Sequence, residues 1–201
     1  MSTTFAQPNS RNPFQLLDEI FSAAKAHIHP NPLAMILATA DAQGNPSSRT
    51  VLLKHYDEEG FVFYTNRQSR KGRQLAENPR ASLTFYLPQL HRQIQVEGTV
   101  SRVSDAESDA YWRTRPRESQ IGAWASAQSR AIPPDDSFEA RLREFESRFA
   151  DEPDVPRPRH WGGYRVHPTR IEFWSEKAHR LHERLCYQRT DNSWSVSKLF
   201  P

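Results

Sequence analysis

Residues 34–66 read AMILATADAQGNPSSRTVLLKHYDEEGFVFYTN, and this stretch decides the fold class. Apolar runs at 34–39, 49–53 and 61–65 have the length and the β-branched and aromatic content of strands. The segments between them, DAQGNP at 41–46 and DEEG at 57–60, are rich in residues that form tight turns. Strand, turn, strand, turn and strand at this spacing predict an antiparallel meander.

The rest of the chain adds helices and further strands to this meander. Asn12 and Pro13 predict the N-terminus of a first helix, and residues 104–107 have the pattern of a capping box. Further helices are expected at 69–78 and 136–149, and further strands at 81–87, 92–103, 164–166, 171–174, 185–188 and 194–196. Because strands return after the helices, we predict one α+β domain at 13–201, preceded by a flexible segment at 1–12.

The composition favours a cytoplasmic protein. Hydrophobic residues make up 36% of the 201 positions, which is low for a self-sufficient monomer. No apolar run approaches the roughly 20 residues that a membrane-spanning helix needs, and the polar residues 1–12 do not resemble a signal peptide. The single cysteine, Cys186, excludes an internal disulfide and is typical of a reducing compartment. We expect it to be a small packed side chain.

The charges favour local anion sites over a nucleic-acid surface. Lys and Arg number 27 against 24 Asp and Glu, a net charge of +3, and the arginines are scattered among acidic residues. One basic cluster contains Arg49, Lys54, Arg70 and Lys71, with Ser69–Lys71 opening a helix whose N-terminus could bind a phosphate. We expect Arg49 and Lys54 at opposite ends of one strand, where they could equally be ordinary solvated charges.

Two other groups could carry chemistry. Tyr111 and Arg115 are four residues apart and are expected on one helix face, while Ser119 could cap the next helix. They could hold a second phosphate, or simply form a helix surface and a cap. His182 could act as a general acid or base, although histidines beside arginines are more often surface groups. His179 and His182 have no obvious third ligand, so no metal site is predicted.

Several long motifs resemble one known family. RTVLLKHYD (49–57), FVFYTN (61–66) and SRK (69–71) resemble the flavin-binding half of the pyridoxamine 5'-phosphate oxidase family. RPRESQIGAW (115–124), WGGYRV (161–166), IEFW (171–174) and HRLHER (179–184) resemble the remainder, in the family's order. The resemblance extends over residues 13–201. It implies an antiparallel Greek-key split β-barrel of the FMN-binding type, with peripheral helices.

The resemblance also implies a homodimer that holds FMN at the subunit interface. Arg70 and Lys71 would bind the FMN phosphate. The full set of implied FMN contacts is Arg49, Val51, Leu52, Lys54, Tyr64, Thr65, Arg70, Lys71, Gln93, Gln128, Ser129, Trp174 and Arg184. The substrate phosphate would lie on Lys54, Tyr111, Arg115 and Ser119. The candidate catalytic residues Arg180 and His182 would lie against the substrate ring, where Arg180 orients it and stabilises developing charge.

The implied reaction is the oxidation of pyridoxamine or pyridoxine 5'-phosphate to pyridoxal 5'-phosphate. A hydride passes from the substrate C4' to flavin N5, and O2 then reoxidises the flavin with release of H2O2. The partners are a small-molecule substrate and O2; no nucleic acid, membrane or metal is expected.

One departure from the family pattern keeps other substrates open. Family members carry an N-terminal Arg-x-x-Tyr lid over the substrate, whereas residues 1–12 contain Arg11 but no tyrosine. We therefore expect the lid to be missing or replaced. The related phenazine-biosynthesis oxidases also lack this lid and oxidise larger dihydrophenazine carboxylic acids. The four-residue phosphate set favours the B6 phosphates, and Arg180 and His182 argue against a non-catalytic flavin-binding module.

Overall fold

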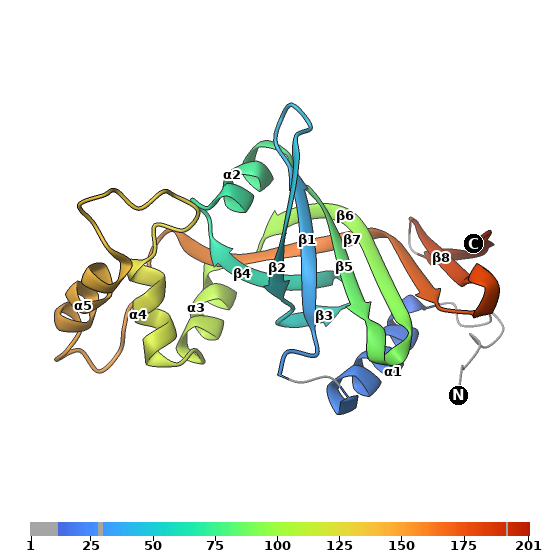
Figure 1. Ribbon diagram of the computed structural model, residues 1–201, viewed down its shortest axis with the longest axis horizontal. Helices are drawn as coiled ribbons and strands as arrows, with labels where there is room; N and C mark the ends of the chain where they lie inside the picture. The colour runs from blue at the N-terminus through green and yellow to red at the C-terminus, as the bar shows by residue number, and fades with distance from the viewer. Residues whose placement is uncertain (1–11, 28–29, 192) are drawn as a thin grey trace.

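A computed structural model describes residues 12–27, 30–191 and 193–201, and its elements form one curled antiparallel sheet with α3, α4 and α5 at one end and α1 packed beneath it (Figure 1). The predicted flexible segment 1–12 lies outside the described residues except for Asn12. The described strands are β1 (Ala34–Ala40), β2 (Pro46–Leu52), β3 (His55–Asp57), β4 (Gly60–Asn66), β5 (Arg80–Leu87), β6 (Arg92–Arg102), β7 (Trp161–Ser175), β8 (Glu183–Thr190) and β9 (Ser193–Leu199). The described α-helices are α1 (Pro13–His27), α2 (Arg70–Glu77), α3 (Asp105–Arg113), α4 (Arg117–Ala125) and α5 (Phe138–Arg148).

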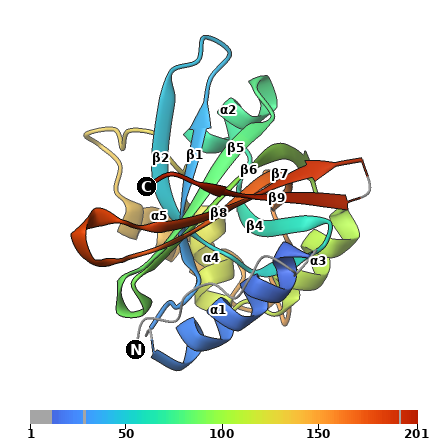
Figure 2. The same ribbon diagram turned by 90° about the vertical axis from the view of Figure 1, so that its right-hand side faces the viewer.

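The strand order, β2-β1-β5-β6-β7-β4-β3, confirms the antiparallel class, and β7 is its central strand. One edge of β7 pairs with β6 along most of its length. The other edge pairs with β4 at residues 161–166 and with β8 at residues 170–175, and β9 continues the sheet from β8. The sheet therefore splits beyond the middle of β7, which leaves the β8–β9 hairpin at the far end from α3, α4 and α5 (Figures 1 and 2).

The strand β7 corrects the sequence-based boundaries. Segments 164–166 and 171–174 were expected as separate strands, with Pro168 between them, but they form one strand. The β6–β7 ladder shifts register here: Glu97 pairs with Arg170 and Gly98 with Pro168, so Thr169 of β7 is an extra, bulged residue. The bulge lies next to Pro168, which has no N–H to donate to the ladder. Gly98 permits this close approach, since a Cβ there would lie 2.0 Å from the carbonyl oxygen of His167.

The main core lies between the sheet and α1. The Asn12 side chain accepts a hydrogen bond from the Phe14 N–H at 2.9 Å, which confirms the predicted cap. The apolar stripe of α1 is buried, and Phe21 contacts Phe85 and Tyr56 with ring centroids 4.9 and 5.1 Å apart. Cys186 is buried, as predicted. The sheet is thus closed on one side by a helix whose apolar periodicity was readable in the sequence.

A second core cluster forms where the chain between β6 and β7 folds into α3, α4 and α5. Trp112, Ile121, Phe149, Val155 and Trp161 form this cluster. The indole of Trp112 donates to the carbonyl of Val155 at 2.7 Å, which fixes the proline-rich connection that precedes β7. No helix in the described part of the chain is long and apolar enough to span a membrane.

We predict that Gly98→Ala destabilises the protein by about 2–3 kcal/mol, because the new methyl group would displace the backbone of β7. Thermal and denaturant unfolding would measure the loss. Gly122→Ala in α4 is the matched control: nothing lies within 4 Å of a Cβ there, so its stability should equal or exceed that of the wild type by up to about 1 kcal/mol. Equal stability of Gly98→Ala and wild type would contradict this account of the bulge.

Candidate functional site

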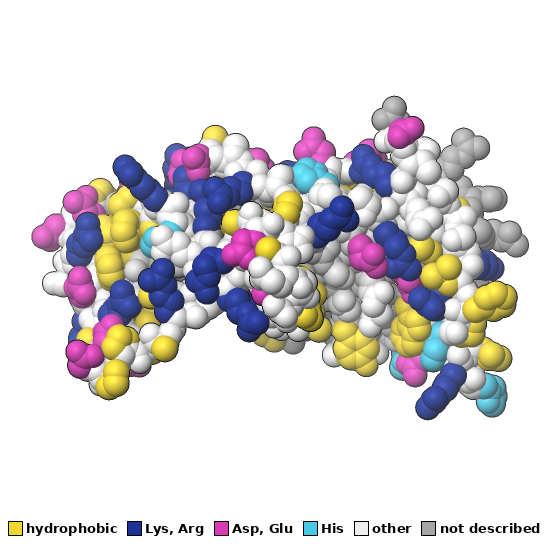
Figure 3. All heavy atoms as spheres, turned by 90° about the horizontal axis from the view of Figure 1, so that it is seen from above, with side chains coloured by type: hydrophobic (Ala, Val, Ile, Leu, Met, Phe, Trp, Pro, Cys, Tyr) yellow, Lys and Arg dark blue, Asp and Glu magenta, His cyan; other side chains and the backbone are white. Residues whose placement is uncertain are grey.

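A hollow of about 410 Å³ lies between β4 and the helical end of the molecule. Its wall includes several residues singled out in the sequence: Tyr64, Thr65, Arg115, Ser119 and Gln128. Viewed from above, several Lys and Arg side chains lie over this half of the molecule among acidic ones (Figure 3). The wall of the hollow is therefore partly aromatic and contains the cation Arg115.

Beside this hollow lies a buried cluster built around Lys71. Ser69 caps α2 by accepting from the Gly72 N–H at 3.3 Å, which places Lys71 in the first turn, as predicted. The Lys71 ammonium donates to Thr65 Oγ1 at 3.2 Å and to Gln128 Oε1 at 3.0 Å. Thr65 also donates to Gln128 at 3.0 Å, so β4, α2 and the loop after α4 meet at one lysine.

Arg49 supplies a second cation to the same region. Its guanidinium donates to the Leu37 carbonyl, to Thr39 Oγ1 at 2.6 Å and to Ser47 Oγ. In the described part of the chain, no carboxylate lies within ion-pair distance of Arg49 or Lys71. Burial, and then the charge of Arg49, lowers the pKa of Lys71 to about 8. Burial followed by the charge of Arg70 lowers the pKa of Arg49. The cluster therefore lacks an internal counter-ion and suits a phosphate group.

Three near-parallel aromatic rings cluster at the hollow, and two of them, Tyr64 and Trp161, line it. Tyr64 stacks on Tyr111 at 4.1 Å and on Trp161 at 5.3 Å between ring centroids. The Lys54 ammonium lies 5.9 Å from the Tyr111 ring, and the Arg115 guanidinium lies 4.7 Å from the Trp161 ring. Burial lowers the pKa of Arg115. Two cations therefore lie near the faces of this aromatic cluster.

Gly163 in β7 makes room for the trio. A Cβ at this position would lie 2.7 Å from the Tyr64 ring and 2.5 Å from a methyl group of Val103. The Ser108 hydroxyl accepts from the Gly163 N–H at 3.2 Å, which ties β7 to α3. The second glycine of the WGG motif therefore lets Tyr64 lie against the strand.

A second group of predicted site residues lies on the other end of β7. Gln93 pairs with Trp174 across β6 and β7, and Trp174 pairs with Arg184 across β7 and β8, so the three form one cross-strand row. His182 lies beside the row, with its ring centroid 4.6 Å from that of Trp174. The backbone N–H of Lys177 donates to His182 Nδ1 at 3.3 Å, which leaves Nε2 as the protonated nitrogen of a neutral ring.

The short 3₁₀ turn before β8 (Ala178–Arg180) has an unusual backbone. His179 and Arg180 both have positive φ values, 58° and 61°. Non-glycine residues adopt this conformation at a cost of about 1–2 kcal/mol each, and such strain is concentrated at functional sites. Arg180 ends this turn and His182 follows it, so both residues lie at the same end of the sheet as Trp174.

One strand separates the two groups of site residues. Trp161 borders the first group and Trp174 belongs to the second, 13 residues apart in β7. At about 3.3 Å per residue this corresponds to roughly 40 Å of strand. Figures 1 and 2 show α3 and α4 at one end of the sheet and the β8–β9 hairpin at the other. A single chain therefore does not bring all the predicted residues into one cavity.

The structure corrects several local expectations. Arg49 lies in the middle of β2, and Lys54 lies beyond its end, so they do not mark the two ends of one strand. Arg115 follows α3 and is not on the helix with Tyr111, although its side chain reaches the same trio. Ser119 does not cap α4; it lies in the first turn, and its carbonyl accepts from Arg115 at 2.8 Å.

The remaining predicted residues lie close to the first group. Val51 and Leu52 end β2, Arg70 is the first residue of α2, and Ser129 follows Gln128 with a positive φ of 70°. Sequence reasoning missed Gln74, whose Oε1 accepts from Thr39 at 2.6 Å and from Ser47 at 2.8 Å and so supports the groups that hold Arg49. The only signal was its place on the buried face of α2.

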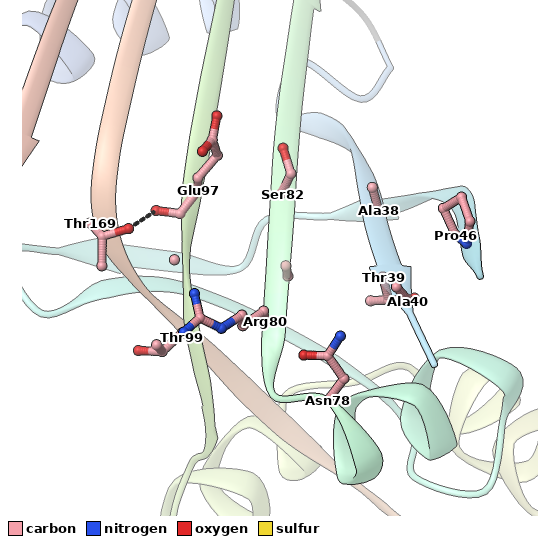
Figure 4. A pocket seen from close by; sticks show the side chains of 12 residues that line it. Ala38, Thr39, Ala40, Pro46, Asn78, Arg80, Ser82, Glu97, Thr99 and Thr169 are labelled. Carbon is pink, nitrogen blue, oxygen red and sulfur yellow. Dashed lines mark hydrogen bonds between the residues drawn. The ribbon is translucent and has the colours of Figure 1, made fainter. Parts of the chain in front are cut away.

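A second hollow, of about 380 Å³, lies on strands β1, β5, β6 and β7 and contains none of the predicted site residues (Figure 4). Arg80, Ser82, Glu97 and Thr99 are among its lining residues. Among the residues that the structure describes, no group of three or more His, Cys, Asp and Glu side chains could hold a metal ion.

Comparison with known proteins identifies the family. Residues 21–149 match the family described as pyridoxamine 5'-phosphate oxidase, and residues 161–201 match the pyridoxine 5'-phosphate oxidase C-terminal dimerisation region. A pyridoxine/pyridoxamine 5'-phosphate oxidase of Myxococcus xanthus (strain DK1622) is 50% identical over 94% of this chain and 92% of its own length. The corresponding protein of Sphingopyxis alaskensis is 52% identical over 96% of this chain and 88% of its own length.

Solved structures agree with this assignment. PhzG from Burkholderia lata 383, in complex with tetrahydrophenazine-1-carboxylic acid, has a TM-score of 0.90 and 32% identity, with complete coverage of both chains. A pyridoxamine 5'-phosphate oxidase-related, FMN binding protein from Nostoc punctiforme has a TM-score of 0.76 at 16% identity and shows the same fold. The predicted split-barrel fold is confirmed. By its family matches and by relatives half identical over nearly its whole length, this chain belongs to the pyridoxamine 5'-phosphate oxidase family of flavin-dependent oxidases.

Proposed function

We propose that the protein binds FMN and oxidises pyridoxamine or pyridoxine 5'-phosphate to pyridoxal 5'-phosphate, with O2 as the electron acceptor and H2O2 as the product. The observation that carries this proposal is a pair of separate cationic sites beside one hollow. Arg49 and Lys71 form one site. Lys54, near the Tyr111 ring, and Arg115, near the Trp161 ring, supply the cations of the other. A phosphorylated cofactor and a phosphorylated substrate together require two anion sites.

The buried cluster fits the phosphate of FMN. Lys71 is 7% exposed and is not neutralised by a described carboxylate, so a phosphate would supply the missing counter-charge. Arg70 lies at the N-terminus of α2, where the helix dipole favours an anion. The family resemblance assigns the FMN phosphate to Arg70 and Lys71, in agreement with this geometry.

We further propose that the complete site forms between two copies of the chain. The Gln93–Trp174–Arg184 row and the Lys71 cluster lie at opposite ends of β7, whereas all four residues are expected on one FMN. Residues 161–201 match a dimerisation region, and exposed apolar side chains on the sheet, including Ile36 and Tyr86, suit a subunit interface. A two-fold symmetric dimer then has two equivalent sites.

On the substrate side, Lys54, Tyr111, Arg115 and Ser119 would bind the phosphate, and Arg180 and His182 of the other subunit would contact the ring. Bound flavin supplies the chemistry by accepting the hydride from C4' and passing both electrons to O2. Arg180 would hold the substrate ring in place by its charge, and the Nε2–H of His182 would donate a hydrogen bond to a substrate oxygen. The strained turn at 179–180 would fix both side chains before the substrate binds.

A second candidate substrate is a dihydrophenazine carboxylic acid. The full-length structural match to PhzG, whose complex holds tetrahydrophenazine-1-carboxylic acid, favours it. The relatives described as pyridoxine/pyridoxamine 5'-phosphate oxidases are nearer in sequence, at 50–52% identity against 32%. A carboxylic acid also leaves part of the Lys54–Arg115 phosphate set unused.

We predict that pyridoxine 5'-phosphate bleaches the flavin absorption of the purified protein under anaerobic conditions, because a phosphate on the substrate matches the second cationic site. Pyridoxal phosphate and H2O2 should then form when air is admitted. Bleaching by a dihydrophenazine carboxylic acid alone would establish the second candidate. No bleaching by either compound would indicate a flavin-binding module without turnover.

The Arg115→Ala variant links this result to the site. Its KM for pyridoxine 5'-phosphate should rise about 30- to 100-fold, as expected for a lost charge-assisted contact worth about 2–3 kcal/mol. Arg113→Ala is the matched control, because Arg113 is an exposed residue at the end of α3 outside the hollow.

We predict that FMN affinity falls as pH rises above about 8, because the free protein then loses the Lys71 proton that a phosphate would stabilise. The ammonium is present below this pKa and phosphate binding raises the pKa, so Kd should rise about tenfold per pH unit above it. Fluorescence titrations between pH 7 and 10 would measure this. Riboflavin, which has no phosphate, and the Lys71→Met variant with FMN should show a much flatter dependence; a flat curve for wild type with FMN would exclude this role of Lys71.

We predict that two inactive variants restore activity when mixed. Lys71→Met and Arg184→Met change opposite ends of the chain, so a mixed dimer would have one intact site and one doubly altered site. After unfolding and joint refolding at equal amounts, about a quarter of wild-type activity should return. Arg49→Met mixed with Lys71→Met is the control and should return none, because both changes affect the same half of the site. Absence of restoration in the first mixture would place both halves in one chain.

A further inference from the structure

The outer face of β6, β7 and β8 is an ordered array of side chains. Alternate residues of a strand point to one face, so Glu172 and Trp174 of β7 lie on the side opposite the core residues Ile171 and Phe173. One row contains Gln93, Trp174 and Arg184, all expected on FMN. The adjacent row contains Gln95, Glu172 and Cys186. Glu172 is therefore the neighbour of the flavin row at the centre of three strands.

The Glu172 carboxylate bridges two arginines. Its Oε1 accepts from Arg184 Nε at 2.7 Å and its Oε2 from Arg184 Nη2 at 3.1 Å, so the contact is bidentate. Arg170 Nη2 donates to the same Oε2 at 2.5 Å, and Arg170 Nη1 donates to Glu97 at 2.9 Å. Glu172 is 3% exposed, whereas Arg184 remains about a third exposed. The acid is thus hidden below a guanidinium that is open to a ligand.

These contacts fix both the position and the plane of the Arg184 guanidinium. Two of its N–H groups bind Glu172, and Nη1 donates to the Phe200 carbonyl at 3.1 Å. A planar guanidinium held at three points cannot rotate about its last bonds. Burial alone would raise the pKa of Glu172, but the hydrogen bonds and charges of Arg184 and Arg170 outweigh it and lower that pKa. The carboxylate therefore remains ionised at neutral pH.

Without the negative charge of Glu172, the guanidinium groups of Arg170 and Arg184 would repel each other. Arg170 and Arg184 lie on either side of the carboxylate, and the charge of Arg170 disfavours that of Arg184. Removing the carboxylate leaves two guanidiniums with no charge between them. Arg184, the more exposed of the two, would then move out of the row with Gln93 and Trp174.

We propose that Glu172 is a positioning residue of the flavin site, which holds Arg184 in the row that contacts the FMN bound mainly by the partner subunit. The inference rests on the proposed function, because it takes Arg184 as an FMN contact. Glu172 itself does not touch the cofactor. Its role is to present a rigid, partly exposed guanidinium, in the way that groups behind a ligand-binding side chain orient it.

The test is a double-mutant cycle read out as FMN affinity. The full-length protein is stripped of flavin, and FMN is titrated into wild type, Glu172→Gln, Arg184→Met and the double variant. Glu172→Gln should raise the Kd for FMN about 10- to 100-fold, the range typical for the loss of a group that orients a ligand-binding side chain. In the Arg184→Met background the same change should have little further effect, because Glu172 acts through Arg184. A purely structural role would give equal effects in both backgrounds.

Two further variants make the result decisive. Glu97→Gln is the matched control: Glu97 contacts Arg170 and lies beside the second hollow (Figure 4), so FMN affinity should stay within about twofold of wild type. Glu172→Asp keeps the charge but shortens its reach, and it should weaken FMN binding through the lost bidentate contact. This variant decides the matter if Glu172→Gln does not fold.

The outcomes separate this inference from the proposed function. A wild-type protein that does not bind FMN would overturn the proposed function itself. Unchanged affinity of Arg184→Met would remove Arg184 from the site, and the role of Glu172 with it. Weaker binding by Arg184→Met together with wild-type affinity of a folded Glu172 variant would overturn the positioning role alone.

Discussion

The rigidity of β7 is the constraint on which the rest of the structure depends. A strand paired on both edges cannot bend back on itself, so the aromatic residues near its two ends stay far apart. Trp161 lines the hollow beside α3 and α4, and Trp174 lies in the cross-strand row beside the β8–β9 hairpin. A site that needs both ends must join the end of one chain to the opposite end of another. A two-fold symmetric dimer would achieve this with one interface and two sites.

The end of β7 near α2 carries positive charge that no described carboxylate neutralises. The buried Lys71 and the half-buried Arg49 donate to hydroxyl and amide groups that accept hydrogen bonds but carry no negative charge. Burying such a cation costs free energy, and here the cost appears as the lowered pKa of Lys71. A bound phosphate would offset it, so the folded state should be markedly more stable with cofactor than without. At the other end of β7, Glu172 and Glu97 together balance the charges of Arg170 and Arg184 without a ligand.

Local signals in the sequence were sufficient for the elements but not for their long-range relations. The Asn12 cap, the Ser69 cap and the capping box at Ser104 were all readable, since each depends on residues within one helical turn. The continuity of β7 was missed because it depends on a bulge at Thr169, which forms only against Gly98 of β6, 70 residues earlier in the chain than Pro168. Gln74 was missed for the same reason, because its partners come from β1 and β2.

The residues expected on FMN and those expected on the substrate lie mostly on different elements, which explains how related chains can differ in substrate. Most residues expected on FMN lie on β2, β4 and the β6–β8 row, which form the sheet, and at the start of α2; Gln128 and Ser129 follow α4. The residues expected on the substrate lie mostly on α3, α4, their connection and the turn before β8. These helices pack through their own small core, so their surface can change without altering the sheet. A PhzG structure that retains this fold at 32% identity while holding a phenazine acid accords with such independence. Substrate preference should therefore depend on a few side chains around the aromatic trio, against a flavin site that the sheet keeps constant.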